Sequence, residues 1–143
     1  MAKLNLFKTI FDFLDNSARI SPDKVGLIFE NREYTYKEIK GRADDVSCLL
    51  ADKAKRGDII ALLSPNVPEM IFCYFGILGA GRIVLLLSSN ISDENLIMQI
   101  KKINPKFIFS HRKYKSKLEQ LAQSTQPKEH PFGEWGKEPL KFP

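Results

Sequence analysis

GDIIALLSPNVPEMIFCYFGILGAG, residues 57 to 81, is the stretch that decides the fold. Its run from Ile59 to Leu63 is apolar without alternation, which is typical of a strand buried on both faces in a parallel sheet. Pro68 suits the first turn of a helix, because proline lacks an N–H that this turn leaves unbonded. Apolar residues at helical spacing follow, and glycines end the helix before the next apolar run, Ile83 to Leu87. The stretch predicts a strand, a helix and a second strand joined by a right-handed crossover.

Polar residues mark where three helices are expected to begin. Asn66 is expected to be the N-cap of the helix that contains Pro68. Thr35 and Glu38 have the spacing of a capping box, in which each side chain bonds the free backbone N–H of the other residue. Ser92 is expected to cap a third helix, whose first turn is acidic and so complements the helix dipole.

The flanking elements follow from hydrophobic spacing, glycine and proline. They are a helix from about Asn5 to Ala18, strands Val25 to Phe29 and Glu33 to Thr35 with a turn at Asn31-Arg32, a helix opening at Thr35, a helix from Ser92 to Ile103, a strand from Lys106 to Ser110, and a helix from about Lys113 to Gln123. In the second helix the expected buried stripe is Ile39, Ala43, Val46 and Leu50, and the expected outer face includes Lys40 and Asp44. Strands that alternate with helices predict a parallel sheet covered by helices on both faces, with the hairpin as an antiparallel edge or a side element.

Composition is that of an ordinary globular protein of one domain, with 43% hydrophobic and 27% charged residues. No apolar segment approaches the roughly 20 residues that span a bilayer, and the N-terminus does not resemble a secretory signal. We therefore expect a cytoplasmic protein. Cys48 and Cys73 lie in apolar helical patterns without metal-type spacing, so both are expected to be buried thiols.

The net charge of +5 comes largely from the second half of the chain. Basic residues gather there at Lys101, Lys102, Lys106, Arg112, Lys113, Lys115 and Lys117. Such a patch can attract phosphate or nucleic acid. These residues alternate with apolar ones, however, so a solvated helix face is the preferred interpretation and nucleic-acid binding is the weaker one.

Several short motifs occur in an order and spacing that are specific as a set. They are Pro22-Asp23-Lys24, the run Tyr34 to Ile39, the run Gly57 to Ala61, Asn66 with Glu69, and the run Tyr74 to Gly81. Together they resemble the beginning of the adenylate-forming (AMP-binding) superfamily, which includes acyl- and aryl-CoA ligases, luciferases and peptide-synthetase adenylation domains. The resemblance implies a three-layer, Rossmann- or flavodoxin-like α/β subdomain over residues 1–123. Prolines and glycines after that point predict an irregular tail or linker over residues 124–143, which matches no feature of the family.

The resemblance also implies ATP-dependent activation of a carboxylic acid to an acyl-adenylate, followed by transfer to a thiol. The complete enzyme would use ATP and Mg²⁺. The family's Ser/Thr/Gly-rich loop ending in Pro-Lys-Gly, its later acidic and aromatic motifs and its C-terminal lysine do not occur in these 143 residues. We therefore assign no catalytic, cofactor-binding or metal-binding residue, and expect a structural part that binds no cofactor and is inactive alone. Its partner would be the rest of the enzyme or another protein, and exposed apolar surface would allow a homodimer.

Two departures from the family pattern leave an alternative open. Arg82 stands where the family typically has a small apolar residue, and Leu87-Ser88-Ser89-Asn90 replaces a proline–leucine–asparagine-like loop. The alternative is a stand-alone, non-catalytic binding module derived from the same fold.

Four groups of residues have a functional and a structural interpretation. Gly76, Gly79 and Gly81 follow a helix, whereas a dinucleotide fingerprint precedes one, so packing and helix termination are preferred. Ser88-Ser89-Asn90 follow a strand, where ligands of parallel sheets gather, but turn formation and capping are preferred. His111 also follows a strand, but it lacks a nucleophile or metal partner evident in the sequence, so a functional role is the weaker interpretation. Asp44-Asp45 and Asp93-Glu94 are interpreted as charged surface and dipole compensation rather than as acid–base pairs.

Overall fold

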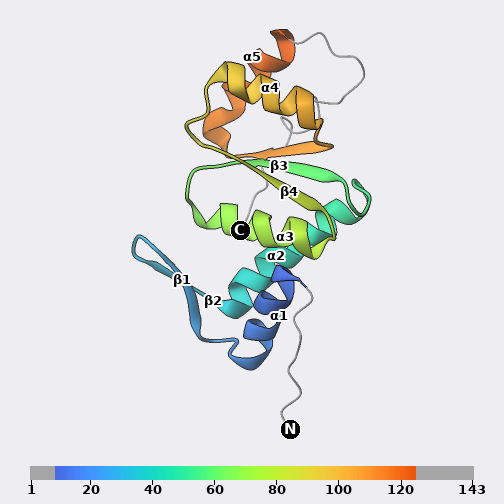
Figure 1. Ribbon diagram of the computed structural model, residues 1–143. Coiled ribbons are helices and arrows are strands. Elements are labelled where there is room, and N and C mark those ends of the chain that lie inside the picture. Colours follow the sequence, from blue (N-terminus) through green and yellow to red (C-terminus); the bar gives the residue numbers. More distant parts are fainter. Residues whose placement is uncertain (1–8, 125–143) are drawn as a thin grey trace. The chain divides into compact units, whose positions relative to one another are not determined.

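The computed structural model describes residues 9 to 124, which contain five strands, five α-helices and a 3-10 helix (Figure 1). In chain order they are α1 (Ile10–Ile20), β1 (Val25–Phe29), β2 (Arg32–Thr35), α2 (Tyr36–Ala51), β3 (Ile59–Leu63), α3 (Pro68–Gly79), β4 (Ile83–Leu87), α4 (Asp93–Ile103), β5 (Phe107–Ser110), η1 (Arg112–Tyr114) and α5 (Lys115–Ser124). They fall into two compact units. The first holds α1, β1, β2, α2 and α3, and the second holds β3, α4, β5, η1, α5 and, from Val84 on, β4.

Helix α1 of the first unit begins later and ends later than predicted. Thr9 and Asp12 form a capping box: the Asp12 N–H donates to Thr9 Oγ1 at 3.3 Å, and the Thr9 N–H donates to Asp12 Oδ2 at 2.8 Å. This cap starts the helix at Ile10 and overrides the apolar spacing from which the prediction was made. The helix runs on to Ile20, and the predicted start at Asn5 lies outside the described residues.

Strands β1 and β2 form a two-stranded antiparallel sheet of their own, so of the two predicted arrangements the side element is confirmed. The predicted turn at Asn31-Arg32 is wrong by one position. Arg32 pairs with Phe29, and the turn is made by Glu30 and Asn31, with Glu30 at φ 53°. A left-handed residue matches the twist of a two-residue hairpin turn, and glutamate gives little sign of it in a sequence.

Helix α2 has the predicted start and the predicted buried face. The Thr35 N–H donates to Glu38 Oε2 at 2.7 Å, and the Glu38 N–H donates to Thr35 Oγ1 at 3.3 Å. The residues of the predicted stripe, Ile39, Ala43, Val46 and Leu50, are all buried. The prediction that Cys48 is buried is wrong, because this residue lies on the exposed side of α2. Cys73 on α3 is buried as predicted.

Pro68 lies in the first turn of helix α3 as predicted, but the N-cap is Val67 and not Asn66, so the helix starts one residue later than the predicted cap implies. Val67 has the extended backbone of an N-cap and makes no capping hydrogen bond with its side chain. Proline at the first helical position removes one of the four N–H groups that the start of a helix leaves unbonded.

The core of the first unit joins its three helices to its hairpin. Buried Leu14, Tyr34, Ile39, Ala43 and Phe72 form one apolar cluster. The rings of Tyr34 and Phe72 meet edge to face, with centroids 5.6 Å apart. Apolar residues separated by up to 58 positions in the sequence are thereby removed from water together, which is the main stabilising term for such a unit.

The second unit is built on a three-stranded parallel sheet of order β4-β3-β5. Residues Ile60 to Leu63 of β3 pair with Phe107 to Ser110 of β5. One core cluster contains residues of all three strands, of α4 and of η1: Ala61, Leu63, Leu87, Leu96, Ile108 and Tyr114. Ser92 caps α4 as predicted, accepting from the Asn95 N–H at 3.3 Å.

The α/β class, the parallel sheet and the small hairpin are therefore confirmed. None of the helices within residues 9–124 is both long enough and apolar enough to span a membrane. The predicted boundary between residues 123 and 124 stays a prediction, since the chain beyond residue 124 lies outside the described residues.

Candidate functional site

Polar residues follow the strands of the second unit, where a parallel sheet most often binds ligands. β3 and β5 run parallel with Leu63 opposite Ser110, so Ser64 and His111 lie at the same edge of the sheet. The His111 N–H donates to the Leu63 carbonyl at 3.0 Å. This edge is the first place to test for a site.

His111 has a structural task at this edge. Its Nδ1 accepts from the Lys113 N–H at 3.3 Å, which makes His111 the N-cap of η1. Within residues 9–124, no three His, Cys, Asp or Glu side chains gather where they could hold a metal ion. The sequence did not predict this capping role: it only made a functional role for His111 the weaker interpretation, because no nucleophile or metal partner is evident in the sequence.

The loop after β4 is held by hydrogen bonds to η1 and α5. Ser88 Oγ accepts from the Asn90 N–H at 3.3 Å, and the Ser89 carbonyl accepts from the Tyr114 hydroxyl at 3.2 Å. Lys117 Nζ donates to the Ile91 carbonyl at 2.9 Å. Turn formation, the preferred interpretation of this loop, is confirmed.

The glycines of α3 serve packing and helix termination, as the preferred interpretation has it. A Cβ at Gly76 would lie 2.4 Å from the Cβ of Val46, and a Cβ at Gly79 would lie 2.6 Å from the ring of Phe11. Gly81 has φ 71°, in the left-handed region that favours glycine at a helix end. Gly76 and Gly79 therefore leave no space beside them for a phosphate.

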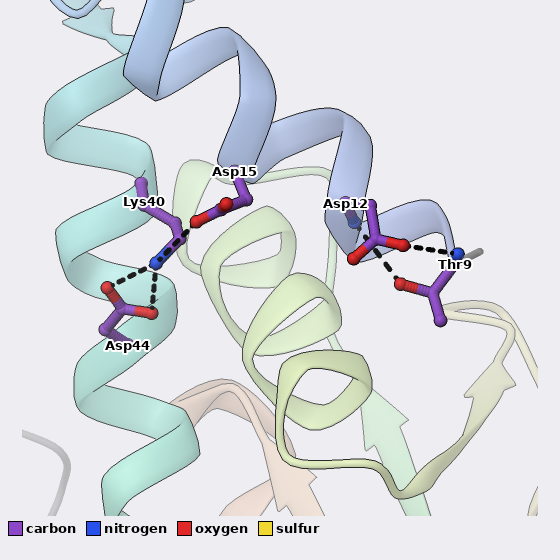
Figure 2. Close-up of polar contacts among 5 residues, drawn as sticks. All are labelled: Thr9, Asp12, Asp15, Lys40 and Asp44. Carbon is purple, nitrogen blue, oxygen red and sulfur yellow. Dashed lines mark hydrogen bonds and ion pairs between the residues drawn. The ribbon is translucent and has the colours of Figure 1, made fainter. Parts of the chain in front are cut away.

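A charged cluster in the first unit links α1 to α2 (Figure 2). Lys40 Nζ lies 2.6 Å from Asp44 Oδ2 on its own helix and 3.4 Å from Asp15 Oδ1 on α1. The ammonium also lies 5.1 Å from the centroid of the Phe11 ring. The prediction that Lys40 belongs to the outer face is wrong, since its side chain is only 19% exposed.

Several groups of the first unit have shifted pKa values. Burial alone would lower the pKa of Lys40, but the hydrogen bonds and charges of Asp44 and Asp15 outweigh burial and raise it. The backbone and side-chain hydrogen bonds of Thr35 lower the pKa of Glu38. Burial, with a smaller contribution from the charge of Glu69, raises the pKa of Cys73 to about 12, so this thiol is a poor nucleophile near neutral pH.

The acidic pairs are used in ion pairs or at a helix start. Asp44 pairs with Lys40, and Asp93 lies 2.6 Å from Lys117 while it occupies the first turn of α4. Dipole compensation is confirmed for Asp93 and Glu94. The i,i+4 spacing of Lys40 and Asp44 was the signal available in the sequence for the cluster in Figure 2.

The basic residues of the second unit do not form one patch. Lys101 and Lys102 lie in the last turn of α4 and Lys106 precedes β5, whereas Arg112 and Lys113 follow the other end of β5. The four residues of that strand extend about 13 Å. Splitting the charge between two edges of the sheet weakens the case for nucleic-acid binding.

The glycines and the acidic pairs singled out in the sequence do not suit ATP and Mg²⁺, which the resemblance implies for a complete enzyme. Phosphate binds where a helix exposes N–H groups at its N-terminus, but Gly79 and Gly81 sit at a C-terminus, where carbonyl groups are exposed. Asp44 and Asp93, which could offer carboxylate ligands, are paired with lysines. The assignment of no cofactor-binding or metal-binding residue stays a prediction.

The comparison with known proteins agrees with the fold. A family model described as "AMP-binding enzyme" matches residues 14–135. The chain is 31% identical over 99 residues to long-chain fatty acid transport protein 6 of Mus musculus, and this alignment covers 68% of this chain and 16% of that protein. It is 26% identical over 99 residues to 2-succinylbenzoate–CoA ligase of Bacillus velezensis, and this alignment covers 68% of this chain and 20% of that protein. The chain thus spans a fifth or less of the length of these two relatives.

Solved structures show the same fold. The anthranilate CoA ligase AuaEII in complex with anthranoyl-AMP superimposes with a TM-score of 0.76 at 19% identity, over 84% of this chain and 23% of that chain. The N-terminal subdomain of NpsA from Klebsiella oxytoca gives 0.68 at 23% identity, over 73% of this chain and 27% of that chain. At these sequence identities, structural similarity shows that the fold is shared and no more. The assignment to a family rests on the match of the family model to residues 14–135, and it shows that this chain belongs to the AMP-binding enzyme family.

Proposed function

We propose that these residues form the N-terminal structural part of an ATP-dependent ligase that activates a carboxylic acid as an acyl-adenylate and then as a thioester. The family match over residues 14–135 carries the proposal. The names of the relatives agree with it, since they include 2-succinylbenzoate–CoA ligase and the long-chain-fatty-acid–CoA ligase of Bacillus subtilis. ATP, Mg²⁺ and the acid would be bound by the complete enzyme.

In this proposal the chain contributes scaffold rather than chemistry. The described polar residues at the edge of the sheet are engaged in caps and turns, and the described carboxylates do not gather into a metal site. The phosphate loop ending in Pro-Lys-Gly does not occur in the sequence. The chain alone should therefore form no adenylate, because we find no group among residues 9–124 placed to stabilise the charge that develops on the transferred phosphate.

The first test is ATP–pyrophosphate exchange by the 143-residue chain with a panel of fatty and aromatic acids. We expect no acid-dependent exchange, with a full-length CoA ligase of the family as the positive control. Acid-dependent exchange by the chain alone would show that it carries its own adenylation site and would refute the scaffold role.

The second test asks whether the chain can act as that scaffold. Residues 9–124 replace the corresponding segment of a full-length family ligase, and the chimera is assayed for thioester formation. We expect measurable activity in the chimera and its loss when Ala43, which is fully buried, is changed to aspartate. A folded chimera without activity would contradict the proposal.

The alternative is a stand-alone, non-catalytic binding module, favoured by Arg82 and by the unusual loop after β4. Pull-down with the tagged chain separates the two. Capture of the remaining part of a ligase supports the scaffold, whereas stoichiometric capture of an unrelated protein supports the module.

Location and self-association belong to the same proposal. Several large apolar side chains are exposed, which suits a chain that packs against further protein. They are Ile10, Phe13, Ile20, Val25, Ile28, Ile83, Leu86 and Met98. Sedimentation velocity over a concentration series would detect a homodimer, and fractionation of the source cells would test the proposed cytoplasmic location.

A further inference from the structure

Backbone carbonyl groups from two separate segments of the first unit converge on the side chain of Arg82. Arg82 Nη2 donates to the carbonyl oxygens of Leu50 at 3.0 Å and Ala51 at 3.4 Å, and also to that of Ala54. Arg82 Nη1 donates to the carbonyl of Ala80. The first three carbonyls lie at the end of α2, and the fourth lies just after α3.

At the end of α2 the Leu50 carbonyl already accepts from the backbone N–H groups of Ala54 at 3.1 Å and Lys53 at 3.3 Å, and Arg82 adds a side-chain donor to it. The helix stops at Ala51 with Asp52 in right-handed conformation, so it lacks the left-handed glycine that often closes a helix. No basic residue lies in its last turn. The exposed carbonyls and the negative end of the helix dipole therefore favour a cation at this point.

A guanidinium group suits this cluster better than a point charge does. It is planar, stays protonated and presents five donors in a fixed fork, so one group can serve several acceptors at once. Arg82 Nε is buried and has no hydrogen-bond partner among the described residues, so its two terminal nitrogens hold the side chain. Within residues 9–124 the structure records no ion pair between Arg82 and a carboxylate.

We propose that the carbonyl oxygens of Leu50, Ala51, Ala54 and Ala80 form an internal cation site selective for guanidinium, with Arg82 as its resident ligand. The site ties the end of α2 to the turn between α3 and β4. The Gly57 N–H donates to the Gly81 carbonyl at 3.0 Å beside it, which links the same two segments a second time. Residues 50–57 and 79–82 therefore open and close together.

Chemical rescue tests the selectivity of the site. In the full chain, Arg82→Ala should lower the midpoint of thermal unfolding by about 5 °C or more, because four carbonyl groups lose the guanidinium as a donor. Millimolar methylguanidinium should restore part of that loss, whereas tetramethylammonium at the same concentration should not. The matched control is Arg19→Ala, which removes a guanidinium that donates to Asn16 on the surface of α1. Rescue of both variants alike, or an unchanged midpoint in Arg82→Ala, would overturn the proposal.

Amide hydrogen exchange tests the joint opening without relying on the alanine variant to fold. Arg82→Lys keeps the charge but offers one donor centre in place of the fork, so the amides of Ala54 and Gly57 should exchange about tenfold faster than in the wild type. In the ¹⁵N-labelled wild type, the Nη–H signals of Arg82 should be resolved and slow to exchange. Averaged Nη signals in the wild type, or unchanged exchange in Arg82→Lys, would show that the guanidinium is not held.

Discussion

The backbone of Gly76 lies directly against the side chain of Val46. A Cβ at Gly76 would meet the Val46 Cβ at 2.4 Å and the Ala43 carbonyl oxygen at 2.7 Å. The carbonyl of Gly76 accepts from Ser47 Oγ at 2.8 Å in the same contact. α2 and α3 thus approach so closely that a side chain has no room, which explains a glycine inside a helix despite its low helix propensity.

Gly76→Ala should therefore destabilise the chain by about 2 kcal/mol, because overpacking outweighs the better helix propensity of alanine. Gly41→Ala is the matched control: Gly41 also lies inside a helix, and a Cβ there would have no neighbour within 4 Å. The control should gain up to about 1 kcal/mol. Urea denaturation measures both. A gain of stability in both variants would mean that helix propensity, and not the contact with Val46, decides the outcome.

The ion pair between Lys40 and Asp15 should contribute modestly to the packing of α1 on α2. A double-mutant cycle of Lys40→Met and Asp15→Asn should give a coupling energy of about 0.5 kcal/mol, since Asp15 is exposed and water screens it. Methionine keeps an apolar stem against Phe11, so the cycle isolates the charge. The exposed pair Lys115 and Glu119, 3.8 Å apart, should give a smaller value. A larger coupling in that exposed pair would contradict this ranking.

The contribution of the Lys40 charge to stability should also decrease in alkaline solution. The pKa of Lys40 is raised above its ordinary value of 10.5, so its contribution is complete below pH 10.5 and is lost as the pH rises through the folded pKa. Unfolding of the wild type and of Lys40→Met between pH 8 and about 11.5 checks this. The difference between the two should shrink only above pH 10.5. A difference that is constant through pH 11 and beyond would refute the role of the charge.

The start of α2 should weaken in acid. Hydrogen bonds from Thr35 lower the pKa of Glu38 below its ordinary value of 4.5, so the contribution of this carboxylate is present above pH 4.5 and is lost as the pH falls through the folded pKa. Glu38→Gln keeps an oxygen for the Thr35 N–H but does not titrate. Helix content followed by circular dichroism from pH 6 down to about 2 should fall less steeply in the variant. Identical curves would count against the capping box as the acid-sensitive group.

The two cysteines should differ sharply in reactivity. Cys48 is exposed, whereas Cys73 is buried and its pKa is raised to about 12, so a maleimide at pH 7.5 should label one thiol rapidly and the other after unfolding. Mass spectrometry of the native and the denatured chain counts the labels. Cys48→Ser should abolish the rapid phase, and Cys73→Ser should leave it unchanged. Rapid labelling of Cys73 in the folded chain would show that α3 is less well packed than the structure has it.

The sequence by itself predicted the elements whose signals are local. Each of these signals lies within one short segment of the chain. They are the capping box of Thr35 and Glu38, the buried stripe from Ile39 to Leu50 and the apolar run of β3. Side-chain spacing follows helix and strand geometry directly, so no distant partner is needed to interpret it. The same holds for the cap at Ser92, and for the order of motifs that resembles the AMP-binding family.

Tertiary structure decided the features whose partners are far apart in the chain. The hairpin became a separate sheet, Lys40 turned inward between Asp44 and Asp15, and Arg82 reached carbonyl groups up to 32 residues away. Sequence spacing carries no signal for such contacts, because they depend on how helices pack once apolar surface has left water. Cys48 shows the same limit: an apolar pattern on a helix marks the residues that can be buried, and packing against the neighbouring helices decides which of them are.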